Sequence, residues 1–132
     1  MSETLWALPV SLSLIMRGPF FAEHPKRECE ISFTIEGDDG KELPISLHFG
    51  SVQVFKCTML YSLGSIDRGL RKDSYGKVIS LGDSKWLTEV RESYDRYCSI
   101  GHISEAELRH LMITFDDGPC YEFICSTFYV QQ

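Results

Sequence analysis

Apolar and polar residues alternate along residues 28–49, on both sides of an Asp-Asp-Gly turn at residues 38–40. The apolar positions are all odd-numbered: Cys29, Ile31, Phe33, Ile35, Leu43, Ile45, Leu47 and Phe49. A period of two predicts two strands that bury one face. Residues opposite each other in a hairpin share a face, so Ile35 must oppose Leu43. This register requires a three-residue loop that ends in a left-handed glycine, Gly40.

The same register predicts further features of this hairpin. The opposed pairs are Phe33 with Ile45, Ile31 with Leu47 and, on the solvated face, Glu30 with His48. Pro44 cannot donate to a sheet ladder, which favours an edge strand or a strand start. At Gly50-Ser51 the apolar positions change from odd to even, which indicates a bulge or bend.

A second Asp-Asp-Gly turn, at residues 116–118, predicts a second hairpin between residues 111 and 125. With the same loop, the opposed pairs are Leu111 with Phe123, Ile113 with Tyr121 and Phe115 with Pro119. Both faces of this hairpin are rich in apolar residues, as in strands that are covered on both sides. A helix or a second sheet of the same chain is the favoured cover, and a partner subunit is the alternative.

Three other segments carry a pattern. Apolar residues alternate from Leu5 to Met16, which predicts a first strand. An export signal is not expected, because the chain opens without a basic segment. Lys77 to Leu81 predicts a short strand. An amphipathic helix is predicted at about 84–98, capped by Asp83 or Ser84, and its apolar face comprises Trp86, Leu87, Val90, Tyr94 and Tyr97. Ser104 and Glu107 predict one short helical turn beyond it.

These patterns predict a single β-rich domain over residues 1–132. The fold class is mainly β (α+β), with about six or more antiparallel strands and the one helix. A sandwich and a partly open barrel remain alternatives. The net charge of −6 argues against nucleic-acid binding and against adhesion to anionic membranes. Five cysteines, an odd number, favour reduced thiols in a cytoplasmic protein over a secreted disulfide framework.

Candidate chemistry is sparse. No histidines or cysteines show the close spacing of a structural metal site, so neither metal nor cofactor is expected. Cys98 with His102 lacks a surrounding nucleophile motif, and a core or helix-end thiol is the better interpretation. Three carboxylates, at 116, 117 and 122, are too few for Ca²⁺. We predict no catalytic residue, and the candidate binding residues lie in predicted loops: Arg68, Arg71, Lys72, Asp116 and Asp117.

Two segments resemble a group of small, uncharacterised bacterial β-rich proteins. They are Leu81-Gly82-Asp83-Ser84-Lys85-Trp86-Leu87 and the hairpin HLMITFDDGPCYEFIC from His110 to Cys125. In that group a Leu-Gly-x-Ser-x-Trp-Leu helix start precedes a C-terminal hairpin of this type. The resemblance implies a bacterial cytosolic β-rich domain and no activity, since the group has no assigned function. Small bacterial immunity proteins are similar in size, acidity and architecture, which is an analogy of fold alone.

Two classes of function follow. We expect first a non-enzymatic protein-interaction module, which either self-associates as a homodimer or binds one protein partner, as an immunity protein does. The two-sided second hairpin and the acidic charge motivate this hypothesis. The alternative is a small-ligand carrier whose pocket is lined by aromatic residues: Phe33, Phe49, Phe115, Tyr121 and Phe123. An enzyme is not expected, because no acid, base, nucleophile or metal set emerges.

Overall fold

The computed structural model describes residues 3–10, 14–59, 75–115 and 119–132. Within these ranges the chain forms nine strands and one α-helix, which confirms the predicted mainly β fold. In chain order the elements are β1 (Glu3–Ala7), β2 (Ile15–His24), β3 (Glu28–Glu36), β4 (Glu42–Gly50), β5 (Val54–Thr58), β6 (Lys77–Ser80), α1 (Lys85–Gly101), β7 (Arg109–Thr114), β8 (Cys120–Cys125) and β9 (Thr127–Gln131).

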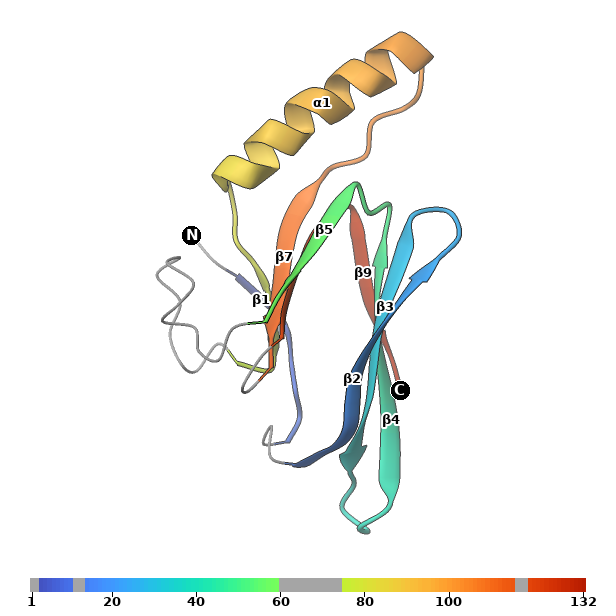
Figure 1. The fold of residues 1–132 in the computed structure, drawn as a ribbon, viewed down its shortest axis with the longest axis vertical. Coiled ribbons are helices and arrows are strands. Elements are labelled where there is room, and N and C mark those ends of the chain that lie inside the picture. Colours follow the sequence, from blue (N-terminus) through green and yellow to red (C-terminus); the bar gives the residue numbers. More distant parts are fainter. Residues whose placement is uncertain (1–2, 11–13, 60–74, 116–118) are drawn as a thin grey trace.

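The strands form two antiparallel sheets that face each other as a sandwich (Figure 1). One sheet has the order β1-β6-β7-β8-β5 and the other has the order β2-β3-β4-β9. Of the two predicted alternatives, a sandwich and a partly open barrel, the structure has the sandwich arrangement, and the described strands do not close into a barrel. The core lies between the sheets, where Ile31, Leu47 and Phe123 are each 0% exposed.

The first hairpin has the predicted register. Ile35 opposes Leu43, and all the other predicted pairs are present, including Glu30 with His48. The loop closes with two hydrogen bonds: Gly37 N–H donates to Lys41 O at 2.8 Å, and Gly40 N–H donates to Gly37 O at 2.9 Å. Gly40 has φ 76°, the left-handed conformation that the register requires. Pro44 lies beyond the last β4–β9 pair, Ser46 with Gln131, so no ladder partner needs its missing N–H.

The second hairpin is also confirmed within the described residues. Leu111 opposes Phe123 and Ile113 opposes Tyr121, and Phe115 N–H donates to Pro119 O at 3.1 Å. Every residue of β8 is buried, as are all but the first of β7. The second sheet covers one face, and on the other Leu87 of α1 packs against Ile124. The chain itself thus supplies a sheet and a helix as cover, which was the favoured interpretation. The turn at 116–118 lies outside the described residues.

A continuous bent ribbon joins the two sheets. Its first strand runs through β4 and β5, and its second runs through β8 and β9. The ladder continues across the bend, because Ser126 N–H donates to Gly50 O at 3.0 Å and Gln53 N–H donates to Ile124 O at 2.8 Å. Three residues, 51–53, face two, 125 and 126, between the pairs Gly50–Thr127 and Val54–Ile124. This extra residue, together with Ser51 at φ 52°, is the predicted bulge.

The N-terminal prediction was wrong. Residues 5–16 do not form one strand, because β1 ends at Ala7 and β2 begins at Ile15. The two strands belong to different sheets. The chain turns where Pro9 removes a backbone donor, although the apolar alternation continues past it. The alternation reflects burial at both ends of this segment, but it does not reveal that the chain passes from one sheet to the other between them.

Helix α1 begins as predicted and extends further. Ser84 caps it by accepting a hydrogen bond from Leu87 N–H. The helix runs to Gly101, where left-handed His102 (φ 53°) and the Ile103 N–H to Cys98 O bond of 2.9 Å end it. The short turn predicted from Ser104 and Glu107 does not form, since residues 103–108 are irregular. Side chains of α1 bind this segment instead: the Tyr94 hydroxyl accepts from Ala106 N–H at 2.9 Å.

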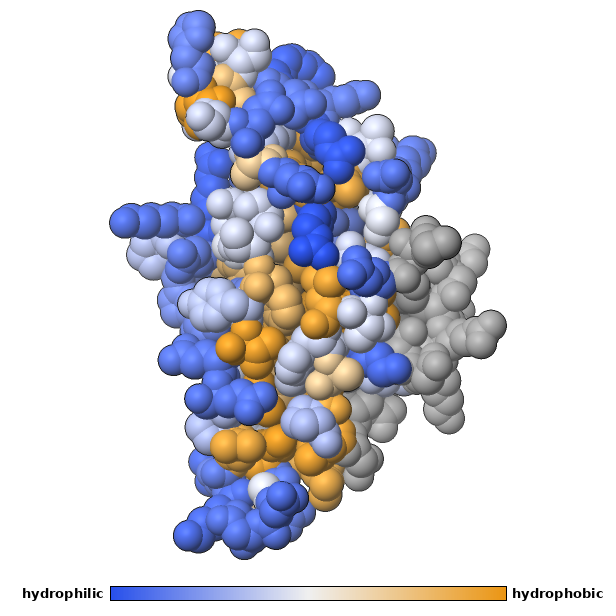
Figure 2. All heavy atoms as spheres, turned by 180° about the vertical axis from the view of Figure 1, so that it is seen from behind, coloured by the Kyte–Doolittle hydropathy of each residue, from blue (hydrophilic) through white to orange (hydrophobic). Residues whose placement is uncertain are grey.

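The surface is not uniformly hydrophilic. Figure 2 shows hydrophobic side chains in a band down the middle of one side of the molecule, between more hydrophilic margins. Hydrophobic side chains also appear at the upper end, where α1 ends. At that end Ile100 is 80% exposed and Tyr97 is 50% exposed, although Tyr97 was predicted on the apolar face.

Candidate functional site

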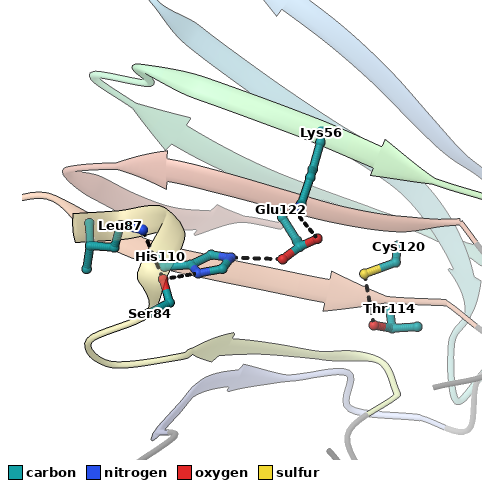
Figure 3. Close-up of polar contacts among 7 residues, drawn as sticks. All are labelled: Lys56, Ser84, Leu87, His110, Thr114, Cys120 and Glu122. Atoms are coloured by element: carbon teal, nitrogen blue, oxygen red, sulfur yellow. Dashed lines mark hydrogen bonds and ion pairs between the residues drawn. The ribbon is translucent and has the colours of Figure 1, made fainter. Parts of the chain in front are cut away.

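A row of polar side chains with a buried centre crosses three strands and reaches α1 (Figure 3). Its members, in order from β5 to the helix cap, are Lys56, Glu122, His110 and Ser84, and we call them the polar row. Glu122 and His110 are 1% and 0% exposed. The spacings are 3.6 Å from Lys56 Nζ to Glu122 Oε2, 2.9 Å from Glu122 Oε1 to His110 Nε2, and 2.7 Å from His110 Nδ1 to Ser84 Oγ.

One arrangement of protons satisfies the inner part of this row. Ser84 Oγ accepts from Leu87 N–H at 3.1 Å, so its own hydroxyl proton is free to donate. In this arrangement His110 Nδ1 accepts that proton, and the imidazole proton lies on Nε2, from which it is donated to Glu122. Trp86 covers the row: its ring meets His110 edge-on at 5.1 Å, and Lys56 Nζ lies 4.4 Å from its centroid.

The serine, imidazole and carboxyl groups have the connectivity of an acyl-transfer triad, yet their surroundings favour a structural role. Ser84 Oγ is committed to the helix cap, and His110 has no solvent exposure. None of the row's members lines either of the two hollows described below. The row joins the start of α1 to the centre of the sheet, where an unpaired buried carboxyl would be costly.

The predicted register of the second hairpin brings two members of this row together, although their spacing along the chain does not. In the predicted register Met112 opposes Glu122, so His110 lies diagonally across the same face, within reach of a long side chain. Ser84 is one of the two predicted helix caps, and the packing of α1 over the sheet brings it to His110. Spacing along the chain does not relate His110 to Glu122, so only the register of the two strands pairs them.

Two adjoining hollows form a groove between α1 and the end of the sandwich. The larger is about 360 Å³ and the smaller about 230 Å³, and both are open to solvent. They share Arg27, Gln53 and Val54, so we treat them as one site, the Arg27 groove. Its remaining lining residues are Glu23, His24, Glu28, Cys29, Val52, Phe55, Val90, Ser93, Tyr94 and Tyr97.

Arg27 lies at the junction of the two hollows and is held from two sides. Its Nη1 donates to Gln53 Oε1 at 3.1 Å, and Gln53 Nε2 donates to Ser51 O at 3.2 Å. The guanidinium carbon lies 5.6 Å from the centre of the Tyr97 ring, within cation–π range. A loop residue and a helix residue are thereby linked across the groove.

Strained backbone gathers beside this groove. Among the described residues, the non-glycine residues with positive φ are Lys26 (67°), Arg27 (61°), Ser51 (52°) and His102 (53°). The first three lie in the β2–β3 turn and the β4–β5 bend, which form one wall of the groove. Left-handed conformations cost a non-glycine residue about 1–2 kcal/mol and cluster at binding and catalytic sites.

The structure does not place the predicted binding residues. Arg68, Arg71, Lys72, Asp116 and Asp117 all lie outside the described residues, so they stay predictions. The other chemical candidates are placed. Cys98 is 2% exposed, and no group of three or more potential metal ligands occurs within the described ranges. None of the five cysteines, all within the described residues, forms a disulfide, and Cys57 is exposed.

Comparison with known proteins found no match among family models, curated proteins or solved structures. The resemblance stated from residues 81–87 and 110–125 therefore stays a prediction. Helix α1, the one helix of the described residues, is not long and apolar enough to cross a membrane.

Proposed function

We propose that this chain is a non-enzymatic protein-binding module and that the Arg27 groove receives a segment of its partner. The observation that carries the proposal is the groove itself, whose two adjoining hollows are open to solvent and lined in part by exposed aromatic side chains. Tyr97 and Phe55 line it at 50% and 39% exposure. Exposed aromatic residues and arginine are the side chains most often found at the centre of protein interfaces.

The charges of the groove suggest the chemistry of the segment. Glu23 and Glu28 border the larger hollow, and the chain carries a net charge of −6. The smaller hollow has Arg27 as its one charged lining residue and is otherwise walled by Val90, Tyr94 and other uncharged groups. A segment with a basic residue at one end and an apolar or aromatic residue at the other fits both hollows.

The small-ligand alternative receives less support. The aromatic residues expected to line its pocket pack on one another within the core: Phe49 stacks on Phe123 at 4.0 Å, and Phe33 meets Phe115 at 5.8 Å. Small-molecule pockets usually enclose most of their ligand, whereas both hollows of the Arg27 groove are open to solvent. The free thiols support a reducing compartment, and we propose the cytoplasm.

Affinity capture with matched variants tests this function. Tyr97→Ala removes one wall of the groove, and Arg27→Asn removes the guanidinium with a residue that tolerates left-handed backbone. Phe20→Ala is the control, because Phe20 is 60% exposed and lines neither hollow. The proposal expects a protein that wild type and Phe20→Ala both capture and that both groove variants lose. Equal capture by all four chains, or no capture by any, contradicts it.

A further inference from the structure

The four outer strands of the sandwich differ in how their free edges are protected. Natural sheets protect their edges with charged residues, proline or irregular backbone, because the unpaired N–H and C=O groups of an edge strand can pair with another strand. Strand β1 begins with Glu3 and contains a register shift, β2 contains Pro19 and two shifts, and β5 has Lys56 at its centre. Three of the four edges therefore carry at least one such device.

Strand β9 carries none of them. Its sequence is Thr-Phe-Tyr-Val-Gln, and its five residues pair with β4 without a shift. It has no charged residue and no proline, and its residues are of types that favour strands. In an antiparallel ladder alternate residues direct their peptide groups away from the existing partner. Strand β9 is the outer strand of its sheet, so these groups are unpaired among the described strands.

The surroundings of β9 are compatible with a docked strand. Tyr129 is 59% exposed and stacks on His48 at 4.5 Å, so its ring is held on the outer face. Phe128 and Val130 point the other way and pack against the core. In Figure 1 β9 lies behind β3, on the side of the molecule where Figure 2 shows the hydrophobic band.

We propose that β9 pairs antiparallel with β9 of a second copy of this chain, which joins two four-stranded sheets into one continuous sheet. A two-fold axis at Tyr129 sets the register. Tyr129 then opposes its own copy, Phe128 opposes Val130, and Thr127 opposes Gln131. These are aromatic, aromatic–aliphatic and polar pairs, each favourable across strands.

Charge selects a second copy as the occupant. Self-pairing of a charged edge places like charges opposite each other, and β9 has no charge to repeat. The rest of the molecule has a net charge of −6, so two copies repel wherever charged surfaces meet. Because β9 is uncharged, this repulsion is smallest when two copies meet at their β9 edges. The proposal is independent of the Arg27 groove, none of whose lining residues lies on β9.

Sedimentation velocity tests the proposal over about 1 µM to 1 mM protein, because a five-residue edge buries less than a standard interface. The wild type should pass from monomer to dimer within this range. Tyr129→Lys should stay monomeric, since it sets two like charges on the axis. Phe20→Lys, at a position with matched exposure of 60%, should dimerise like the wild type.

A mixing experiment separates the register from a general loss of stability. Tyr129→Glu alone should be monomeric, and an equal mixture of Tyr129→Lys and Tyr129→Glu should form a heterodimer. Circular dichroism of each variant checks that it is folded. The proposal is overturned if the wild type stays monomeric throughout, if Tyr129→Lys still dimerises, or if the mixture fails to associate. Protection of the β9 amides only after another protein is added would assign this edge to that protein instead, and would equally overturn it.

Discussion

Replacing Ser84 tests whether the polar row anchors helix α1 to the sheet. The side chain has two roles: it caps the helix by accepting from Leu87 N–H, and its hydroxyl is hydrogen-bonded to Nδ1 of the buried His110. Loss of a serine cap costs about 0.5–2 kcal/mol when alanine replaces it and only a few tenths when glycine does. A buried acceptor left without its donor costs about 1–3 kcal/mol. In the proton arrangement described above, the imidazole proton lies on Nε2 and is donated to Glu122, so Ser84 is the donor to Nδ1.

Two variants of Ser84 distinguish the cost of losing the cap from the cost of losing the hydrogen bond to His110. Ser84→Ala should lose both contributions, about 1.5–5 kcal/mol of unfolding free energy, whereas Ser84→Gly should lose mainly the second, about 1–3 kcal/mol. The backbone at Ser84 has φ −80° and ψ 157°, which either residue adopts without strain. Urea denaturation followed by circular dichroism measures both. Thr88→Ala is the control, since Thr88 makes an exposed hydrogen bond to Ser84 O one turn later. A Ser84→Gly variant within about 0.5 kcal/mol of wild type would refute the anchoring role.

Three further outcomes are expected. Gly40→Ala should lower the unfolding free energy in urea by about 1–2 kcal/mol, because Gly40 has φ 76°. No atom lies within 4 Å of an added Cβ, so the cost comes from the backbone conformation and not from a clash, and a neutral result would contradict the loop geometry. The hydrogen bond from His24 holds the pKa of the Glu30 carboxyl below 4.5, so the stabilisation by the ionised carboxylate is present above that pH and is lost as the pH falls. Glu30→Gln should therefore reduce the loss of folding stability between about pH 5 and 3. Burial raises the pKa of the Cys29 thiol to about 11 and that of Cys125 to about 12, so iodoacetamide at about pH 8 should label exposed Cys57 first. Mass spectrometry measures the labelling of each cysteine, and equal labelling of Cys125 would contradict the described burial.

The hairpins were predictable because their information is local. Alternation with an odd loop leaves one register for Ile35 and Leu43, and that register is observed. The same reasoning failed at residues 5–16, where both neighbouring strands bury apolar residues but in different sheets. Alternation reports which side of a residue is covered, and it does not report which sheet provides the cover.

The candidate sites were not predictable, because their members converge from separate elements. Arg27, Gln53 and Tyr97 come from a turn, a bend and a helix, and no spacing along the chain relates them. The polar row is an intermediate case. Its pair His110 and Glu122 follows from the predicted register, whereas its link to Ser84 depends on how α1 packs over the sheet.

The bent ribbon determines how this sandwich can come apart. Because β4–β5 and β8–β9 each belong to both sheets, the sheets cannot swing open about a flexible connection. Unfolding should therefore be one cooperative event, and the amides of Gln53 and Ser126, which bridge the bend, should exchange only when the whole domain unfolds. The same feature limits how the chain can lengthen. Inserted residues fit at the loop 38–40, which lies at a tip, whereas at 51–53 they would shift one sheet's register against the other.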